Sequence, residues 1–241
     1  MSIYKIRQAF SLLELSLVII VIALLVSAST SGLKIVRKAQ IQSSIKKIFS
    51  YKYAYNEFVL TYQALPGDID NAHTYFDDGT DEICGESGNC NGDGDGILEL
   101  SEKTNSEIYR AWQHLYLANM VETAFDGVWG ETNSVPKASL NDSKISFDYD
   151  ADLFTNILRL GSYSSLEGGD SYGGIVTSKE ARTIDVKYDD GNADSGKIIG
   201  YDAYYVDSGN VTQSDYCLNG SLYKTYNSTD NACSLGFLPD K

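Results

Sequence analysis

Histidine and positive charge are both scarce in this sequence of 241 residues. It contains 2 histidines, and it has no nucleophile elbow, no metal-ligating histidine cluster and no phosphate-binding loop, so an enzyme is disfavoured. Lys and Arg number 19 against 33 Asp and Glu, and the formal charge of −14 argues against nucleic acid as a partner, because phosphates attract cations. Hydrophobic residues make up 43%, which is ordinary for a folded protein and argues against disorder.

The few positive charges are concentrated near the N-terminus. Residues 1–52 carry 8 Lys or Arg and a single acidic residue, Glu14. Residues 53–241 carry 11 Lys or Arg against 32 Asp or Glu. The plain interpretation is a solvated surface. The sharper one is that basic and acidic parts of neighbouring copies attract each other, an effect that salt would screen.

Cysteine is limited to four residues in two local pairs, Cys84 with Cys90 and Cys217 with Cys233. Four cysteines allow three connectivities, and the short spacing between Cys84 and Cys90 makes local pairing the simplest. Neither spacing is typical of a zinc site. The sequence therefore predicts two disulfides and an oxidising compartment.

A long apolar run follows a short basic leader at the N-terminus. Between residues 10 and 28 only Ser11, Glu14, Ser16 and Ser27 are polar, and the stretch has about the length that crosses a bilayer. A carboxylate near the centre of such a helix costs ~2.5–3.5 kcal/mol, and less near an end, so Glu14 needs a partner. If the chain is cut after residue 9, the new α-amino group lies one helical turn before Glu14 and neutralises it.

The junction reads Ala9-Phe10-Ser11-Leu12-Leu13-Glu14, and it resembles the prepilin cleavage and methylation signature of type IV pilins and type II secretion pseudopilins. The resemblance implies that a prepilin peptidase cuts between Ala9 and Phe10 and methylates the amine of Phe10. It also implies that Glu14 orders subunit docking. Ala9 departs from the family, which usually has glycine at that position.

The same resemblance implies the partners and the location of the protein. The apolar segment is first an anchor in the inner membrane and later the core of a helical filament of identical or different subunits. Lys5 and Arg7 precede the span and further cations follow it closely, so the positive-inside rule leaves the orientation nearly balanced. The cysteines favour a head in the periplasm, and the finished filament is periplasmic or extracellular.

Two other interpretations of the N-terminus remain open. Val26-Ser27-Ala28 has the small residues that signal peptidase requires, so an ordinary signal peptide cut after Ala28 would release a secreted calcium-binding protein. A plain single-pass anchor is the third interpretation. Glu14 within the apolar run, and a helical pattern that continues beyond Ala28, favour the prepilin.

The helical pattern continues as an amphipathic helix and then stops. Apolar residues recur at spacings of three and four, and Leu65-Pro66-Gly67 ends the pattern. We therefore expect a leader at 1–9, a transmembrane and stem helix at 10–64, and a globular head at 65–241. The expected buried stripe consists of Ile41, Ile45, Ile48, Tyr51, Tyr55, Phe58 and Tyr62.

A calcium-type loop is expected early in the head. The segment from Asn91 to Glu102 has the spacing of an EF-hand loop, with Gly96 at the position of the sharp turn. Its role would be to order a loop that has no core of its own. The alternative is an acidic, glycine-rich surface loop next to a disulfide. The candidate calcium ligands are Asn91, Asp93, Asp95, Ile97, Glu99 and Glu102.

The rest of the head is expected to combine helices with strands. Glu102 opens a helix of about twenty residues with an apolar face, on which Trp112 and His114 are packing residues. Thr177-Ser178-Lys179-Glu180 is a capping box and predicts a helix from Ser178 to Tyr188. Strands are expected at 145–149, 198–201, 204–206 and 222–226.

The predicted fold class is therefore α+β and pilin-like, a long N-terminal helix packed on a head with an antiparallel sheet and a calcium-type loop. One acidic segment is left undecided. Asp189, Asp190 and Asp194 suit either a second cation or a solvated turn, and the turn is favoured.

Overall fold

The chain has an α+β fold in its computed structural model. The structure describes residues 11–76, 84, 90–100, 106–128, 133–140, 143–163, 171–207, 210–226 and 230–240. Ala9, Phe10 and Glu102 lie outside these ranges. The elements in chain order are α1 (Leu12–Tyr62), α2 (His73–Phe76), α3 (Glu107–Leu117), β1 (Ser143–Asp150), β2 (Thr155–Ser162), α4 (Ser178–Tyr188), β3 (Ile198–Asp202), β4 (Tyr204–Asp207), β5 (Asn210–Gln213), β6 (Leu218–Asn219), β7 (Leu222–Tyr223) and β8 (Cys233–Phe237).

The chain divides into two compact units, Met1–Gln42 and Ser43–Lys241. In the first unit the described residues are the first part of α1, and its large apolar side chains from Leu12 to Val26 are exposed. Helix α1 is long and apolar enough to cross a membrane, by length and composition. The predicted N-terminal apolar helix is thereby confirmed.

The second part of α1 belongs to the second unit, which we call the head. Ile45, Ile48, Tyr55 and Phe58 are buried, as the spacing of the apolar stripe predicts. The other three residues of the predicted stripe, Ile41, Tyr51 and Tyr62, are half-buried. The helix ends at Tyr62 because the next residue, Gln63, has a left-handed backbone with φ of 56°.

The main sheet of the head is antiparallel and has the strand order β1-β2-β8-β3. Strand β1 lies where alternation predicts a strand, and β3 and β4 lie where residues that favour strands predict them, whereas β7 is shorter than predicted. Strand β8 lies between β2 and β3, and all five of its residues are buried. A central strand of this kind shows no alternation of polar and apolar residues, so the sequence pattern missed it.

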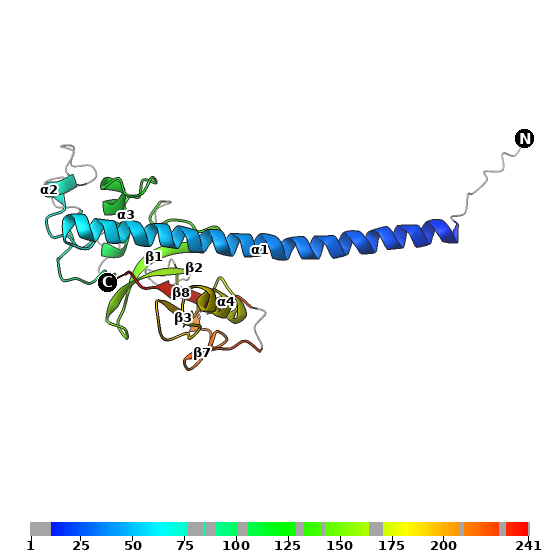
Figure 1. Ribbon diagram of the computed structural model, residues 1–241. Coiled ribbons are helices and arrows are strands. Elements are labelled where there is room, and N and C mark those ends of the chain that lie inside the picture. The colour runs from blue at the N-terminus through cyan, green and yellow to red at the C-terminus, as the bar shows by residue number, and fades with distance from the viewer. Residues whose placement is uncertain are drawn as a thin grey trace, which may run out of the picture. The chain divides into compact units, whose positions relative to one another are not determined.

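The helices pack onto this sheet through aromatic side chains. The ring centroid of Trp112 on α3 lies 4.9 Å from Tyr51 on α1 and 4.6 Å from Phe147 on β1. Tyr55 lies 5.6 Å from Phe147 in the same way. The three elements therefore share one core, in which α1 lies beside α3 and the sheet (Figure 1). The packing role predicted for Trp112 matches its complete burial.

Two local disulfides, Cys84–Cys90 and Cys217–Cys233, are present, as the sequence predicts. Helix α4 also has the predicted bounds. The Thr177 side chain accepts a hydrogen bond from the Glu180 N–H, and the Glu180 carboxylate accepts one from the Thr177 N–H. Helix α3 is shorter than the predicted twenty residues and has 11.

Candidate functional site

The loop from Cys90 to Leu100 is held against the sheet by one asparagine. Asn156 on β2 donates from Nδ2 to the Gly96 carbonyl at 3.0 Å and accepts at Oδ1 from the Leu98 N–H at 2.8 Å. The Leu98 side chain is completely buried. Because both ends of the Asn156 amide are used, the loop has a fixed position although it contains no helix or strand.

Four carboxylates converge at this loop, those of Asp68, Asp93, Asp95 and Glu107. One oxygen of each lies within 4.8 Å of the others. Asp68 and Glu107 are buried, whereas Asp93 and Asp95 are exposed. Asp68 comes from the segment after α1 and Glu107 from the first turn of α3, so the cluster joins three parts of the chain.

Backbone N–H groups orient the buried carboxylates. The two oxygens of Asp68 accept from the Gly94 N–H at 2.8 Å and the Gly96 N–H at 3.0 Å. Glu107 accepts from the Asp93 N–H at 3.0 Å. Both glycines have positive φ, 79° and 86°, a conformation that most side chains disfavour. The glycines between the aspartates therefore let the loop wrap around Asp68.

Burial makes negative charge costly at this cluster. It raises the pKa of Glu107 to about 7, and the neighbouring carboxylates of Asp68 and Asp93 add to the effect. The pKa of Asp68 is also raised, chiefly by burial and further by Asp95 and Asp93. A bound cation would offset both the burial of these carboxylates and their mutual repulsion. Converging carboxylate oxygens are the donors that suit a hard cation such as Ca²⁺, so the residues present fit that ion.

Some of the predicted calcium ligands belong to the four-carboxylate cluster, and others have different contacts. Asp93 and Asp95 join the cluster, whereas the Asn91 oxygen accepts from the His73 N–H at 3.1 Å. The Ile97 N–H donates to Asp95 at 2.7 Å, and Glu99 is exposed. Glu102 lies outside the described residues.

The two buried members of the cluster, Asp68 and Glu107, were not predicted from the sequence. Neither residue belongs to the twelve-residue pattern, and the Asp68 side chain binds N–H groups 26 and 28 residues away. The only local signal was that Glu107 is an acidic residue next to a run with helical periodicity.

A second carboxylate cluster, Asp185, Asp189 and Asp190, lies at the C-terminal end of α4 and does not include Asp194. Asp185 accepts from the Gly191 N–H and from the Tyr223 hydroxyl, each at 2.8 Å. Asp189 accepts from the Ile198 N–H at 2.8 Å. These bonds tie the turn to its neighbours, as the favoured interpretation of a turn requires.

Glu14 lies in the first turn of α1. Its carboxylate accepts from the Ser11 N–H at 2.9 Å, and its own N–H donates to the Ser11 hydroxyl at 3.2 Å. Since α1 begins at Leu12, this pair is a capping box that satisfies two N–H groups at the start of the helix. The prediction for Glu14 rested on its charge and did not include this capping role.

His114 connects the cluster to the end of α1. Its Nδ1 accepts from the Gly67 N–H at 2.8 Å, so its Nε2–H donates to the Cys90 carbonyl at 2.8 Å. Burial lowers the pKa of His114 to about 4, and the nearby Arg110 contributes to the shift. The neutral ring therefore joins Gly67, next to Asp68, to Cys90, where the acidic loop of residues 90–100 begins.

Acid should destabilise the head through His114. The unfolded side chain has a pKa of about 6.5, so between pH 6.5 and 4 the unfolded state binds more protons than the folded state. His114 alone should lower the stability by roughly 3 kcal/mol over that window, whereas Glu107, whose pKa is raised to about 7, acts in the opposite direction because its folded state binds the proton more tightly. Urea unfolding of the full chain in detergent, followed at several pH values, measures this loss.

The matched variant for this measurement is His114→Gln, which does not titrate. As the pH falls from 6.5 to 4, the variant should lose less stability than the parent or gain more, and the difference between the two proteins is the contribution of His114. Equal slopes for the two proteins would mean that the protonation of His114 does not limit acid stability.

The chain matches no family model, no curated protein and no solved structure.

Proposed function

We propose that this chain is a prepilin, the structural subunit of a type IV pilus-like filament or of a type II secretion pseudopilus. The first part of α1 would anchor it in the inner membrane with the head in the periplasm. A prepilin peptidase would cut between Ala9 and Phe10, and other subunits would be its partners in the filament. The observation that carries the proposal is Glu14 at the start of α1, among the exposed apolar side chains from Leu12 to Val26.

The exposed apolar side chains of the first part of α1 support the proposal of assembly. Within its own compact unit, the first part of α1 exposes its large apolar residues. A continuous apolar surface of this kind is unfavourable in water. A bilayer covers them before assembly, and a bundle of such helices would cover them afterwards. The second part of α1 already has its partner, the head core, so the two parts of one helix have different surroundings.

We propose a structural role for calcium in the head. Asp68, Asp93, Asp95 and Glu107 would hold the ion and thereby connect the end of α1, the acidic loop and α3. The ion would supply the positive charge that the buried carboxylates need. Its effect on function would be indirect, because it would fix the loop at one end of the head.

The position of the mature N-terminus tests the proposed function. Mass spectrometry of the protein extracted from membranes should find a chain that starts at Phe10, with a methylated amine. The cut at this site should disappear in a strain without prepilin peptidase. A chain that starts at Ser29 would instead identify a signal peptide cut after Ala28, and an intact leader in the presence of active peptidase would also contradict the proposal.

A further inference from the structure

The outward face of α4 is a basic surface. Lys179, Arg182 and Lys187 line a shallow hollow of about 540 Å³ together with Thr183, Val186 and Thr225. Of these six described residues, three are cationic and none is acidic. Within the described part of the chain, Lys179 and Arg182 form no ion pair. We call this surface the α4 face.

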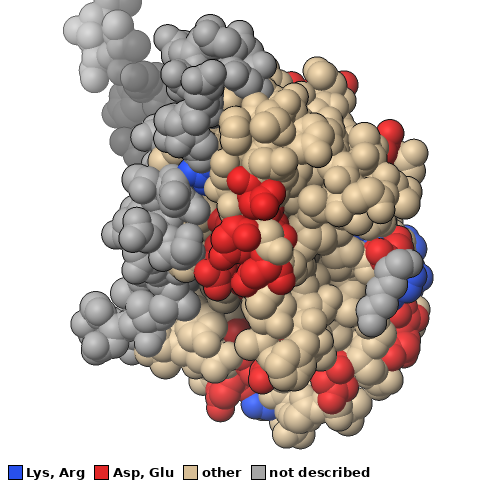
Figure 2. Space-filling model, turned by 90° about the vertical axis from the view of Figure 1, so that its left-hand side faces the viewer, with Lys and Arg blue, Asp and Glu red and all other residues tan. Residues whose placement is uncertain are grey.

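A hollow of opposite charge lies where α1 ends. It has a volume of about 500 Å³, its charged lining residues are Asp68, Asp70 and Asp95, and two tyrosines, Tyr62 and Tyr75, also line it. Among the described residues, no Lys or Arg belongs to the lining. Figure 2, which looks onto this end of the head, shows carboxylates gathered there. Carboxylates beside aromatic rings are suited to a guanidinium or ammonium group. We call this surface the acidic hollow.

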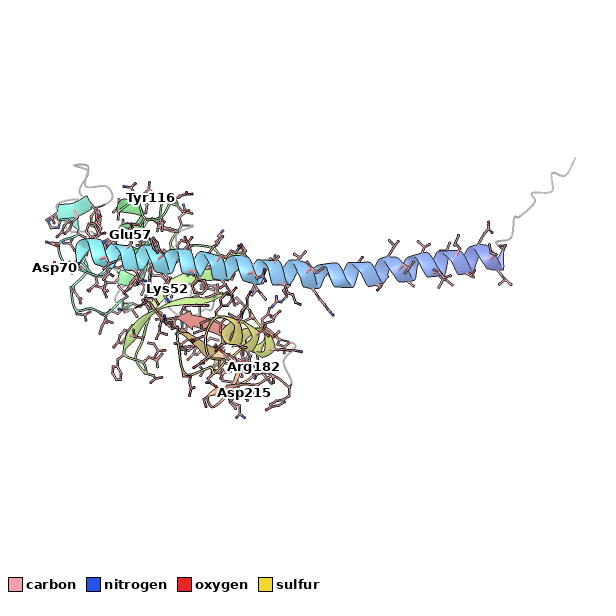
Figure 3. The ribbon with its side chains drawn as sticks, viewed as in Figure 1. Lys52, Glu57, Asp70, Tyr116, Arg182 and Asp215 are labelled. Atoms are coloured by element: carbon pink, nitrogen blue, oxygen red, sulfur yellow. A yellow bond between two sulfur atoms is a disulfide. The ribbon has the colours of Figure 1, made fainter. Side chains whose placement is uncertain are left out.

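The two surfaces lie at opposite ends of the head. Tyr188, the last residue of α4, packs on Phe49 with ring centroids 5.6 Å apart, near the point where α1 enters the head. The acidic hollow includes Tyr62, the last residue of α1. The helix rises roughly 20 Å between these residues. Arg182 and Asp70 accordingly lie at different ends of the head in Figure 3.

We infer that the α4 face of one copy binds the acidic hollow of the next copy, with Arg182 close to Asp70. The two surfaces are complementary in charge and lie at opposite ends of one head, so each copy can use both at once. Such a contact is head-to-tail and does not close on itself in a pair, which is the geometry of an open filament. The inference rests on the proposed function, because it names the contact between neighbouring subunits.

A second copy suits the α4 face better than an anionic membrane does. Residues 53–241 carry 32 acidic residues against 11 Lys or Arg, so an anionic surface repels the head as a whole. The acidic hollow of another copy attracts the α4 face at short range, where screening is weakest. A divalent cation bound by the four carboxylates of the cluster would leave that end of the head negative.

Disulfide cross-linking of the full chain in its native membrane tests the contact. Both native cysteine pairs are already disulfide-bonded, so Arg182→Cys with Asp70→Cys adds the only free thiols. A head-to-tail contact should give a ladder of dimers, trimers and larger products on mild oxidation, which reduction removes. A two-fold contact would give only dimers. The control pair is Arg182→Cys with Phe154→Cys, since Phe154 is 81% exposed.

The charge dependence of the ladder completes the test. The yield should fall several-fold in about 1 M salt, where the screening length is about 3 Å. Lys179→Glu in the same background should lower the yield several-fold, whereas Lys144→Glu, which changes the net charge equally on β1, should not.

Three results would overturn the inference: no ladder, dimers only, or a ladder that neither salt nor Lys179→Glu changes. Labelling of anionic lipid by a photoactivatable group at position 182, without a ladder, would assign the α4 face to the membrane and overturn it as well. The result is separable from the proposed function. A ladder from a chain that does not start at Phe10 would support the contact and refute the prepilin. A chain that starts at Phe10 but gives no ladder would support the prepilin and refute the contact.

Discussion

Glu14→Gln should prevent incorporation into filaments, although it should leave the start of α1 intact. Glutamine at the third helical position maintains the capping box with Ser11, so the helix loses only the charge. In the proposed filament that charge pairs with the α-amino group of Phe10 of a neighbouring subunit. Removal of one partner from a buried pair costs ~3–5 kcal/mol, which corresponds to roughly a hundredfold or more in the assembly equilibrium.

Two further variants separate the charge of Glu14 from its capping role. Glu14→Leu removes both and should fail to assemble, while membrane insertion and head folding persist because the span becomes more apolar. Ser11→Ala removes the hydroxyl that caps the helix but preserves the charge, and it should assemble normally. Counting labelled subunits in sheared filaments measures incorporation. Normal incorporation of Glu14→Gln would show that the carboxylate acts only as a helix cap.

Local signals in the sequence predicted those parts of the fold that depend on neighbouring residues. The capping box of Thr177 and Glu180 predicted both ends of α4, because its hydrogen bonds join residues three positions apart. The stripe on α1 was predicted in the same way, from a period that one face of a helix must have. The two disulfides were predicted because the cysteines of each pair are close in sequence.

Features that depend on distant residues could not be predicted. Strand β8 pairs with β2 and β3, and its burial on both faces removes the alternation by which strands are recognised. The Arg159 guanidinium is an example within the sheet, since it lies 3.9 Å from the centre of the Tyr201 ring and forms an ion pair with Asp148 at 2.8 Å. Nothing in the order of these residues indicates that they meet.

The candidate calcium site combines a part that the sequence predicts with a part that it does not. The spacing of Asp93 and Asp95 within a glycine-rich loop predicted that these two side chains would lie together, and they do. Asp68 and Glu107 join them only because α1 and α3 pack on the same core. The pattern places the last ligand at Glu102, whereas the structure places the buried carboxylate of Glu107 beside the loop.

Calcium should stabilise the head, and Glu107 should be required for that effect. An ion that binds only the folded state adds RT ln(1 + [L]/Kd), or ~2.7 kcal/mol at a hundredfold excess over Kd. Melting of the full chain in detergent, in chelator and in millimolar calcium, measures this gain. Asp93→Asn and Asp95→Asn preserve the hydrogen bond that each side chain accepts from the backbone N–H two residues later but remove a charge, so each should reduce the gain.

Glu107→Gln provides the sharpest form of this test, because the sign of its effect should change with calcium. The pKa of Glu107 is raised to about 7, so its charge destabilises the folded state above that pH when no cation is present. In chelator at pH 8 the variant should be as stable as the parent or more stable. In calcium it should be less stable, because the ion loses a ligand. Asp190→Asn, in the cluster after α4, is the control and should leave the calcium response unchanged.

The comparison of Glu107→Gln with Glu102→Gln then assigns the ligands. Loss of the calcium response in Glu107→Gln alone would identify the converging carboxylates as the site, because that residue lies outside the twelve-residue pattern. Loss in Glu102→Gln alone would favour the EF-hand arrangement instead. Identical melting curves of the parent in chelator and in calcium would refute calcium binding by either set. The four carboxylates would then hold their positions through the backbone N–H groups of the loop.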